Sequence, residues 1–195
     1  GFGEVVFDRN FADFVFSPRI NALFRLNKGY EAIDIFAGRW VGKSSTLDVY
    51  RNIQNHLKEQ IIDNLRGYEG SNIICKSVPY NMPLDYAYNV TNFIGLACSS
   101  VKNLGKTTIL YVADEEGRVL RGSLRGNCDD VDYLEILRSF GIVCEGHKNA
   151  FGIIQMDIEA IDLEELNRII AIAEEGYESR KYKDRIVEVT NMGFF

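Results

Sequence analysis

The stretch TTILYVADEEGRVLRGSLR, residues 107–125, decides the fold class of this chain. Residues 107–113 are rich in β-branched and large apolar side chains, which favours a buried strand. Residues 114–117 read DEEG, a typical hairpin turn, and residues 118–124 form the expected return strand. The stretch therefore predicts a pair of antiparallel strands.

Helical patterns lie on both sides of this pair. Before it, residues 90–104 are mostly small and apolar, which predicts a buried helix. After it, residues 129–140 predict a second helix that begins with acidic side chains, as the helix dipole favours. Asp162 predicts the N-cap of a third helix, because Glu165 stands at the capping-box position.

Three further short runs predict strands, at residues 72–78, 152–158 and 185–189. Strands that alternate with helices indicate an α/β fold. From residue 70 onward we therefore expect a mixed sheet of about five strands, flanked by three helices.

A long amphipathic helix is expected ahead of this domain, over residues 46–65. Its apolar side chains recur every three or four positions, at Leu47, Tyr50, Ile53, Leu57, Ile61 and Leu65. Ser45 or Thr46 is the expected N-cap, and Gly67 is the expected stop. Residues 67–70, GYEG, then suggest a linker between two domains.

The aromatic-rich segment over residues 1–27 is expected to be irregular, and residues 31–36 predict a short helix after it. This first segment holds phenylalanines at positions 2, 7, 11, 14, 16 and 24. So many apolar rings need burial, either on the core of this chain or on a missing partner domain. The chain begins with Gly1 rather than Met, so we expect residues upstream of it.

Composition excludes several classes of function. The net charge of −6 argues against a domain that coats duplex DNA, so any nucleic-acid contact is expected in a small basic cleft on an acidic body. No apolar run approaches the roughly 20 residues that span a bilayer, so no membrane contact is expected. No CxxC pair occurs, which argues against a zinc knuckle and for reduced thiols in a cytoplasmic protein, at Cys75, Cys98, Cys128 and Cys144.

Ser123 and Arg125 form a first candidate for an anion site. Strand alternation places both side chains on one face of the sheet. A guanidinium offers a fork of donors to phosphate, the hydroxyl adds another hydrogen bond, and the neighbouring glycines allow close approach. The alternative is a solvated arginine on a surface strand.

A second candidate lies in residues 141–152, GIVCEGHKNAFG. Here His147, Lys148 and Asn149 form a compact polar cluster behind Gly146. In one interpretation His147 donates to a phosphate or holds a reacting group, and in the other it is a structural histidine.

Three segments together resemble the C-terminal half of DHH-superfamily phosphoesterases. Residues 122–125 (GSLR) and 144–152 (CEGHKNAFG) resemble the GSxR and GGGHxxAxG signatures of the DHH-associated domain. Residues 17–26 (SPRINALFRL) resemble the PRINAxGR segment of RecJ-type exonucleases, which are specific for single-stranded DNA. Glycines of these signatures are replaced here by Cys144, Glu145 and Phe24.

The resemblance implies three parts: residues 1–44 as the remnant of a catalytic domain, residues 45–69 as a connecting helix and linker, and residues 70–195 as a substrate-binding domain. It implies that Ser123 and Arg125 anchor a phosphate and that His147 supports catalysis from the inter-domain cleft. It further implies contacts with nucleic acid or phosphate from Gly146, Lys148, Asn149, Arg19, Asn21 and Arg25.

Enzymes of this superfamily use two metal ions, Mn²⁺ or Mg²⁺, held by Asp and His side chains of the catalytic half. This chain has two histidines and no Asp-His-His run. We therefore expect no metal in this chain, a metal in its full-length parent, and no hydrolysis by the chain alone.

Three functional hypotheses remain open at this point. The first is the substrate-binding part of an exonuclease that acts on single-stranded nucleic acid and works with its own upstream catalytic domain. The second keeps the superfamily but takes short oligoribonucleotides or cyclic dinucleotides. The third is a non-enzymatic module whose phenylalanines bind a protein partner.

Overall fold

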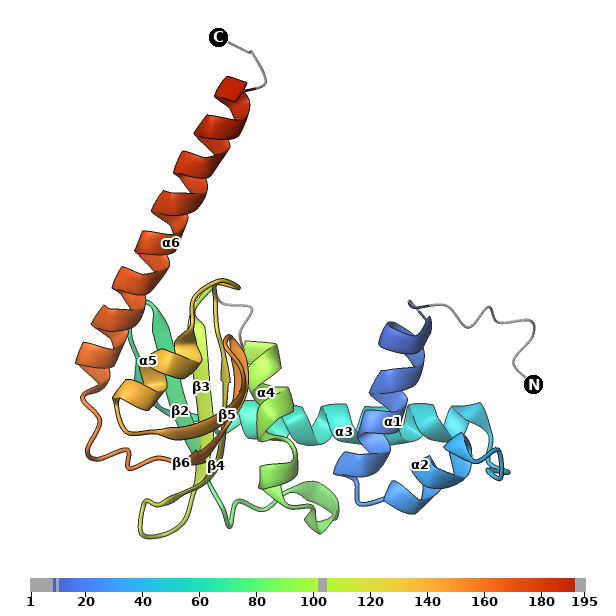
Figure 1. Cartoon of the computed structure of the whole chain (residues 1–195). Helices are drawn as coiled ribbons and strands as arrows, with labels where there is room; N and C mark the ends of the chain where they lie inside the picture. The colour runs from blue at the N-terminus through green and yellow to red at the C-terminus, as the bar shows by residue number, and fades with distance from the viewer. Residues whose placement is uncertain (1–8, 10, 102–104, 192–195) are drawn as a thin grey trace.

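A six-stranded mixed β-sheet forms the body of the molecule in the computed structural model, with α-helices on both of its faces (Figure 1). The structure describes residues 9, 11–101 and 105–191, without the side chains of residues 11, 14 and 180–191. The strands are β1 (Arg66–Glu69), β2 (Ile73–Pro79), β3 (Thr107–Ala113), β4 (Val119–Arg125), β5 (Val143–His147) and β6 (Ala150–Gln155).

The helices follow in the same chain order. The α-helices are α1 (Ser17–Arg25), α2 (Gly29–Phe36), α3 (Ser44–Asp63), α4 (Ile94–Val101), α5 (Tyr133–Ser139) and α6 (Leu163–Asn191). Three short helices complete them: the π-helix η1 (Phe11–Phe16) and the 3-10 helices η2 (Asp85–Ala87) and η3 (Val90–Asn92).

The strand order in the sheet is β1-β2-β3-β4-β6-β5. Strands β2 and β3 pair in parallel, and every other neighbouring pair is antiparallel. A parallel pair needs a crossover connection, and here that connection holds η2, η3 and α4. This crossover brings α4 onto one face of the sheet, beside β3 and β4 (Figure 1).

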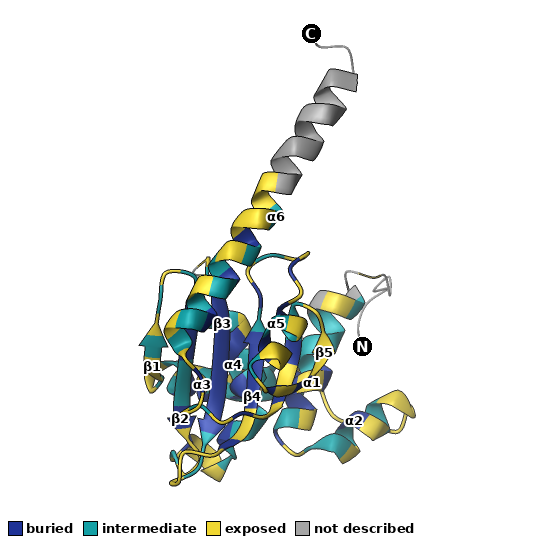
Figure 2. Ribbon diagram, turned by 60° about the vertical axis from the view of Figure 1, so that its left-hand side comes forward, coloured by how far each residue is buried: buried dark blue, intermediate teal, exposed yellow. Residues whose placement is uncertain are grey.

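Each face of the sheet carries its own hydrophobic core, because successive side chains of a strand point to opposite faces. In β3, Ile109 and Tyr111 join the core under α5 and α6, whereas Leu110 and Val112 join the core under α3 and α4. Figure 2 shows the resulting concentration of buried residues in the central strands.

A third, smaller core lies away from the sheet. It holds Ile20 and Leu23 of α1, Ala32 of α2 and Leu47 of α3. The two N-terminal helices therefore pack on the first half of α3, while Leu57 of its second half packs under the sheet (Figure 1).

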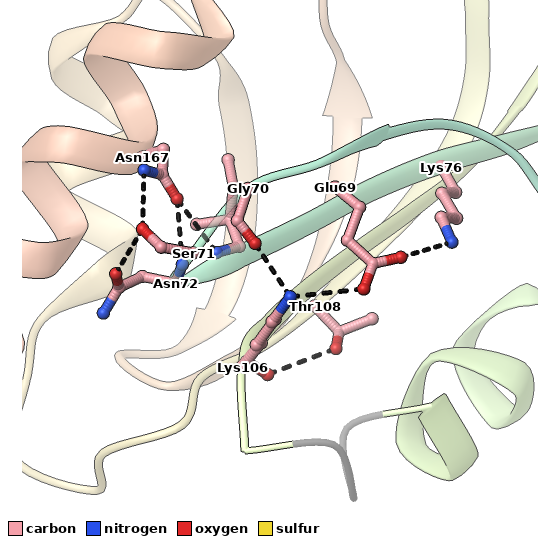
Figure 3. Close-up of polar contacts among 9 residues, drawn as sticks. Glu69, Gly70, Ser71, Asn72, Lys76, Lys106, Thr108 and Asn167 are labelled. Carbon is pink, nitrogen blue, oxygen red and sulfur yellow. Dashed lines mark hydrogen bonds and ion pairs between the residues drawn. The ribbon is translucent and has the colours of Figure 1, made fainter.

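Polar contacts attach α6 to the start of β2 (Figure 3). The Oδ1 atom of Asn167 accepts hydrogen bonds from the backbone N–H groups of Asn72 (3.0 Å) and Ile73 (3.2 Å). On the neighbouring strands, Glu69 of β1 pairs with both Lys76 (2.8 Å) and Lys106 (3.2 Å). The two bonds to Asn167 satisfy backbone donors at the point where β2 begins.

A buried carboxylate lies deeper under α6. Glu174 is 6% exposed. Its Oε1 atom accepts hydrogen bonds from the Thr107 hydroxyl (2.8 Å) and the Tyr133 hydroxyl (2.7 Å), and its Oε2 atom accepts one from Asn72 Nδ2 (3.2 Å). One side chain of α6 thus connects to the chain at the starts of β2, β3 and α5.

The expected α/β class is confirmed, with six strands where about five were expected. The strand over residues 107–113 and the helices over residues 31–36 and 46–65 are present with small shifts at their ends. Residues 90–104 form η3 and α4, with residues 102–104 outside the described part. Asp162 does cap α6, accepting from the N–H groups of Glu164 and Glu165.

Several expectations were wrong. Residues 66–69 form β1 rather than a linker, and residues 143–147 form β5, a strand that was not among those expected. Residues 185–189 continue α6 instead of forming a strand, because extending an existing helix adds one hydrogen bond for each residue fixed. The segment expected to be irregular is helical from residue 11.

The expected helix ends also needed correction. The helix α3 begins at Ser44, so its N-cap is Lys43 rather than Ser45 or Thr46, and it ends at Asp63, before Gly67. The helix α5 begins at Tyr133, later than expected, because the carboxylate of Asp132 caps it by accepting from the N–H of Glu135. Within the described residues, no helix combines the length and the apolar character needed to cross a bilayer.

Candidate anion-binding site

A cavity of about 490 Å³ opens where α1, the start of α4 and the last three strands of the sheet meet. It is lined by Phe24 and Arg25 of α1; Thr91 and Asn92 of η3; Ile94, Gly95 and Leu96 of α4; Arg121, Gly122, Ser123 and Arg125 of β4; Glu145 and Gly146 of β5; and Ala150, Phe151 and Gly152 of β6.

Small residues create this hollow on the α4 side of the sheet. Ser123 of β4, Gly152 of β6 and Glu145 of β5 lie opposite one another across the strands. Since paired residues share a face, the missing side chain of Gly152 leaves the floor at backbone level between a hydroxyl and a carboxylate. Strands lie about 4.8 Å apart, so these two groups start from backbone positions about 10 Å apart.

The guanidinium of Arg125 lies in this cavity with part of its donor set already used. Its Nε donates to the Ser99 hydroxyl (3.0 Å), and its Nη1 donates to the Ser123 hydroxyl (2.7 Å) and the Leu124 carbonyl (2.7 Å). Among the described residues, its Nη2 has no hydrogen-bond acceptor. The group is therefore fixed in orientation and keeps two N–H donors for a ligand.

Ser123 holds this arginine in place. Its hydroxyl donates to the Phe151 carbonyl (3.3 Å) and accepts from Arg125 Nη1. Beneath it, the Cys98 thiol lies 3.3 Å from the Ser123 carbonyl oxygen, and burial raises the pKa of this thiol to about 12. The thiol therefore stays protonated and its S–H faces backbone oxygens.

A second guanidinium approaches from α1. Arg25 Nη1 donates to Oε1 of the buried Gln54 on α3 (3.0 Å), and Asn92 Nδ2 donates to the Arg25 carbonyl (3.2 Å). Burial, and with it the repulsion of the Arg125 charge, holds the pKa of Arg25 below its ordinary value. Two cations that repel each other across a cavity are stabilised when an anion lies between them.

The charge of the lining is positive although the chain is acidic. Three arginines line the cavity, at positions 25, 121 and 125, against the single carboxylate of Glu145. The first turn of α4 also lines it, and the N-terminal end of a helix attracts anions. The expected basic cleft on an acidic body is thus present.

Glu145 sets a testable limit on this attraction. Replacement with glutamine is expected to strengthen phosphate binding about two- to fivefold, because it removes from a partly exposed cavity a negative charge that repels phosphate. Titration of the chain with inorganic phosphate, followed by NMR, measures the change. Glu175→Gln on the exposed face of α6 is the matched control; equal affinities of the Glu145→Gln variant and wild type would contradict the prediction.

The structure brings together four of the residues expected to bind phosphate. Ser123, Arg125 and Gly146 line the cavity, and so does Arg25, whose place in the site came from the family resemblance. His147 does not line it. It pairs with Ala150, which in turn pairs with Arg125, so its side chain starts on the same face of the sheet, exposed at the edge strand β5.

The other expected contact residues lie outside the cavity. Lys148 forms an ion pair with Asp130 (3.2 Å), and Asn149 Nδ2 donates to Asp129 Oδ1 (3.0 Å), so both turn toward the segment before α5. Arg19 is paired with Asp48 of α3. Asn21 is exposed on α1, also outside the lining.

Sequence reasoning missed several of the lining residues. Arg121 carries a usable signal, because it alternates with Ser123 and Arg125 on one strand. Phe24 was noticed as a departure from a family segment, without a role. Thr91, Asn92 and Gly95 carry no signal in the sequence, since the crossover of the chain places them here.

No metal centre accompanies the cavity in the part of the chain that the structure describes. Across those residues, no three His, Cys, Asp or Glu side chains lie close enough together to hold a metal ion. The described residues therefore do not fit the paired Mn²⁺ or Mg²⁺ ions that the family resemblance implies for a full-length parent.

The chain matches known proteins in its fold but not in its sequence. No known family profile matches the chain, and no curated protein sequence matches it either. RecJ from Thermus thermophilus in complex with Mn²⁺ superimposes with a TM-score of 0.55 at 19% identity, covering 87% of this chain and 24% of RecJ. The chain has a RecJ-like fold.

Two further structures show the same RecJ-like fold. Thermus thermophilus RecJ with Mg²⁺ gives a TM-score of 0.54 at 19% identity over 87% of this chain and 26% of RecJ. An exonuclease RecJ bound to manganese gives 0.50 at 19% identity, over 87% of this chain and 41% of that one. The chain thus spans between 24% and 41% of the length of the RecJ structures that it matches.

Proposed function

We propose that this chain is the substrate-gripping part of a phosphodiesterase that acts on single-stranded nucleic acid, and that its cavity holds a phosphate of the substrate. One observation carries the proposal. Two guanidiniums from distant parts of the sequence, those of Arg25 on α1 and Arg125 on β4, line one cavity. The RecJ-like fold supports it.

The proposed binding of phosphate follows from the hydrogen-bond donors of the site. Arg125 offers the N–H pair of Nη2 to phosphate oxygens, Arg25 offers its remaining donors from the other wall, and Ser123 positions Arg125 from below. Charge-assisted hydrogen bonds from arginine to phosphate are strong and directional. We assign His147 to the rim of the cavity, where it contacts the rest of the nucleic-acid strand rather than the phosphate bound in the cavity.

In this proposal, residues outside this chain carry out the hydrolysis. The described residues supply binding and orientation but no cluster that holds a metal ion. The RecJ structures with the same fold contain Mg²⁺ or manganese and are at least twice as long as this chain. The isolated chain is therefore expected to bind a phosphorylated strand and to cleave nothing.

Replacing Arg125 with alanine tests the grip directly. Affinity for a 5′-phosphorylated single strand is expected to fall by about 1–3 kcal/mol, roughly 5- to 150-fold, because a charge-assisted contact is lost. Fluorescence anisotropy at one fixed, low salt concentration measures it.

Two comparisons make the Arg125 result specific. Arg168→Ala on α6 removes an equal charge outside the cavity and is expected to change affinity little. A strand without its 5′-phosphate should bind wild type more weakly than the phosphorylated strand and should lose little on Arg125→Ala. Unchanged affinity in both the Arg125→Ala and the Arg25→Ala variants would refute the proposed phosphate site.

A short ligand is the second candidate, favoured by charge and size. The net charge of −6 disfavours a long polyanion, and a cavity of about 490 Å³ is in the range of small-molecule sites. Strands of increasing length separate the candidates. Affinity that grows with length supports the exonuclease type, whereas a plateau at two or three nucleotides supports an oligoribonucleotide or cyclic dinucleotide.

A further inference from the structure

We propose that Phe24 is a stacking platform for a nucleobase, so that the cavity reads a base as well as a phosphate. The inference rests on the proposed function and extends it from the anion to the ligand class. It assigns to Phe24 a contact with the substrate.

The position of Phe24 on α1 is the first argument. The apolar residues that attach α1 to the fold are buried, namely Ile20, Ala22 and Leu23, with Leu26 directly after the helix. Phe24 is 53% exposed and lines the cavity instead. Its exposed ring contributes little to the core, so its apolar surface is available to a ligand.

Support for the ring is the second argument. A Cβ atom built on Gly29, the first residue of α2, would lie 3.6 Å from Cδ1 and Cε1 of Phe24. One side of the ring therefore lies next to Gly29 at the start of α2. An aromatic side chain supported on one side and exposed on the other is suited to stack on a planar group.

The neighbours of Phe24 are the third argument. Arg25 follows it in the chain, and Phe24, Arg25 and Arg125 all line the same cavity, so a ligand with its phosphate in this cavity shares the cavity with the ring. A phosphate ion alone gains nothing from an apolar ring. A nucleotide has both an anionic and a flat apolar part, and single-strand binding proteins combine cationic grooves with aromatic rings in this way.

Glycines in the lining of the cavity leave room for such a ligand. Gly95 of α4 and Gly152 of β6 line the cavity on the face of the sheet that carries Ser123, and neither places a side chain in it. A site for inorganic phosphate alone does not need a volume of about 490 Å³. The combination of three arginines, one exposed ring and this volume matches a nucleoside phosphate.

The test compares three ligands that share a phosphate: adenosine 5′-monophosphate, ribose 5-phosphate and inorganic phosphate. Phe24→Leu is expected to weaken the nucleotide at least about fivefold, the lower end of what one stacked base contributes, and to leave the other two unchanged. Phe24→Trp is expected to retain or strengthen nucleotide binding. Phe36→Leu is the matched control, because Phe36 is 66% exposed on α2 but lies outside the cavity lining.

NMR of the ligand gives a readout that a structural role would not move. Stacking on Phe24 shifts the adenine ring protons upfield, and this shift is expected to disappear in Phe24→Leu and to persist in Phe36→Leu. Circular dichroism confirms that each variant is folded.

The outcomes separate the two proposals. If phosphate binding depends on Arg125 but Phe24→Leu leaves the nucleotide affinity and the upfield shift intact, the stacking platform is wrong and the phosphate site stands. If Phe24→Leu weakens all three ligands equally, the ring has a structural role and the inference is again wrong. If wild type binds none of the three, both proposals fall.

Discussion

Replacing Gly146 with alanine is expected to lower the free energy of unfolding by about 3 kcal/mol and to weaken phosphate binding. Gly146 has φ of +142°, a conformation that side-chain-bearing residues rarely adopt. A Cβ atom there would lie 2.7 Å from the Phe151 Cβ and 2.9 Å from its Cα. Because Gly146 lines the cavity, relief of this clash must move β5 against β6 and distort the wall.

Gly152→Ala is the matched control for this prediction. A Cβ atom on Gly152 would meet nothing nearer than the Glu145 carbonyl at 3.9 Å, so stability should change by less than about 1 kcal/mol. Urea unfolding followed by circular dichroism measures both variants. Equal stability of the two would show that the hairpin tolerates a side chain at Gly146.

Replacing Glu174 with alanine is expected to destabilise the fold by about 3–5 kcal/mol. The change removes the acceptor of two buried donors, the Thr107 and Tyr133 hydroxyls, and of one partly buried donor, the Asn72 amide. Each unsatisfied buried donor costs about 1–3 kcal/mol, and water that enters the new cavity recovers part of this.

The glutamine variant distinguishes lost hydrogen bonds from lost packing. The Thr107 and Tyr133 hydroxyls both donate to Oε1, so an amide oxygen in Glu174→Gln keeps these two bonds. Its loss of stability is expected to be less than half that of Glu174→Ala, by the same unfolding measurement. An alanine variant that loses less than about 1 kcal/mol would show that the three donors find other partners.

The core of the fold was predictable because its strands carry their own pattern. Over residues 107–113 every side chain but the last is buried, and the turn residues that follow mark the end of the strand. Strand β5 has no such pattern: Cys144 is the one buried residue of its five, so its sequence reads as a loop. Residues 185–189 read RIVEV, which favours a strand locally, but the chain before them is already helical.

Two residues of the candidate site were visible in the sequence for a local reason. Ser123 and Arg125 stand two apart on a strand, so alternation alone places them on one face. Lys148 and Asn149 lie outside the cavity because they contact Asp130 and Asp129, from a segment about twenty positions away that no local pattern connects to them. The approach of Arg25 to Arg125 depends on how α1 packs on α3, which no short-range pattern reports.

The bond between Arg25 and Gln54 bears on where a working fragment must begin. A recombinant protein that starts at residue 70 would retain β2 to β6 and the part of the cavity that includes Arg125. It would lack Phe24, Arg25 and Gln54. The cavity would therefore lose the side that α1 forms and would be open to water there. The smallest unit that keeps both sides of the cavity starts no later than α1, and it also retains α3, whose Leu57 and Ile61 belong to the core under the sheet.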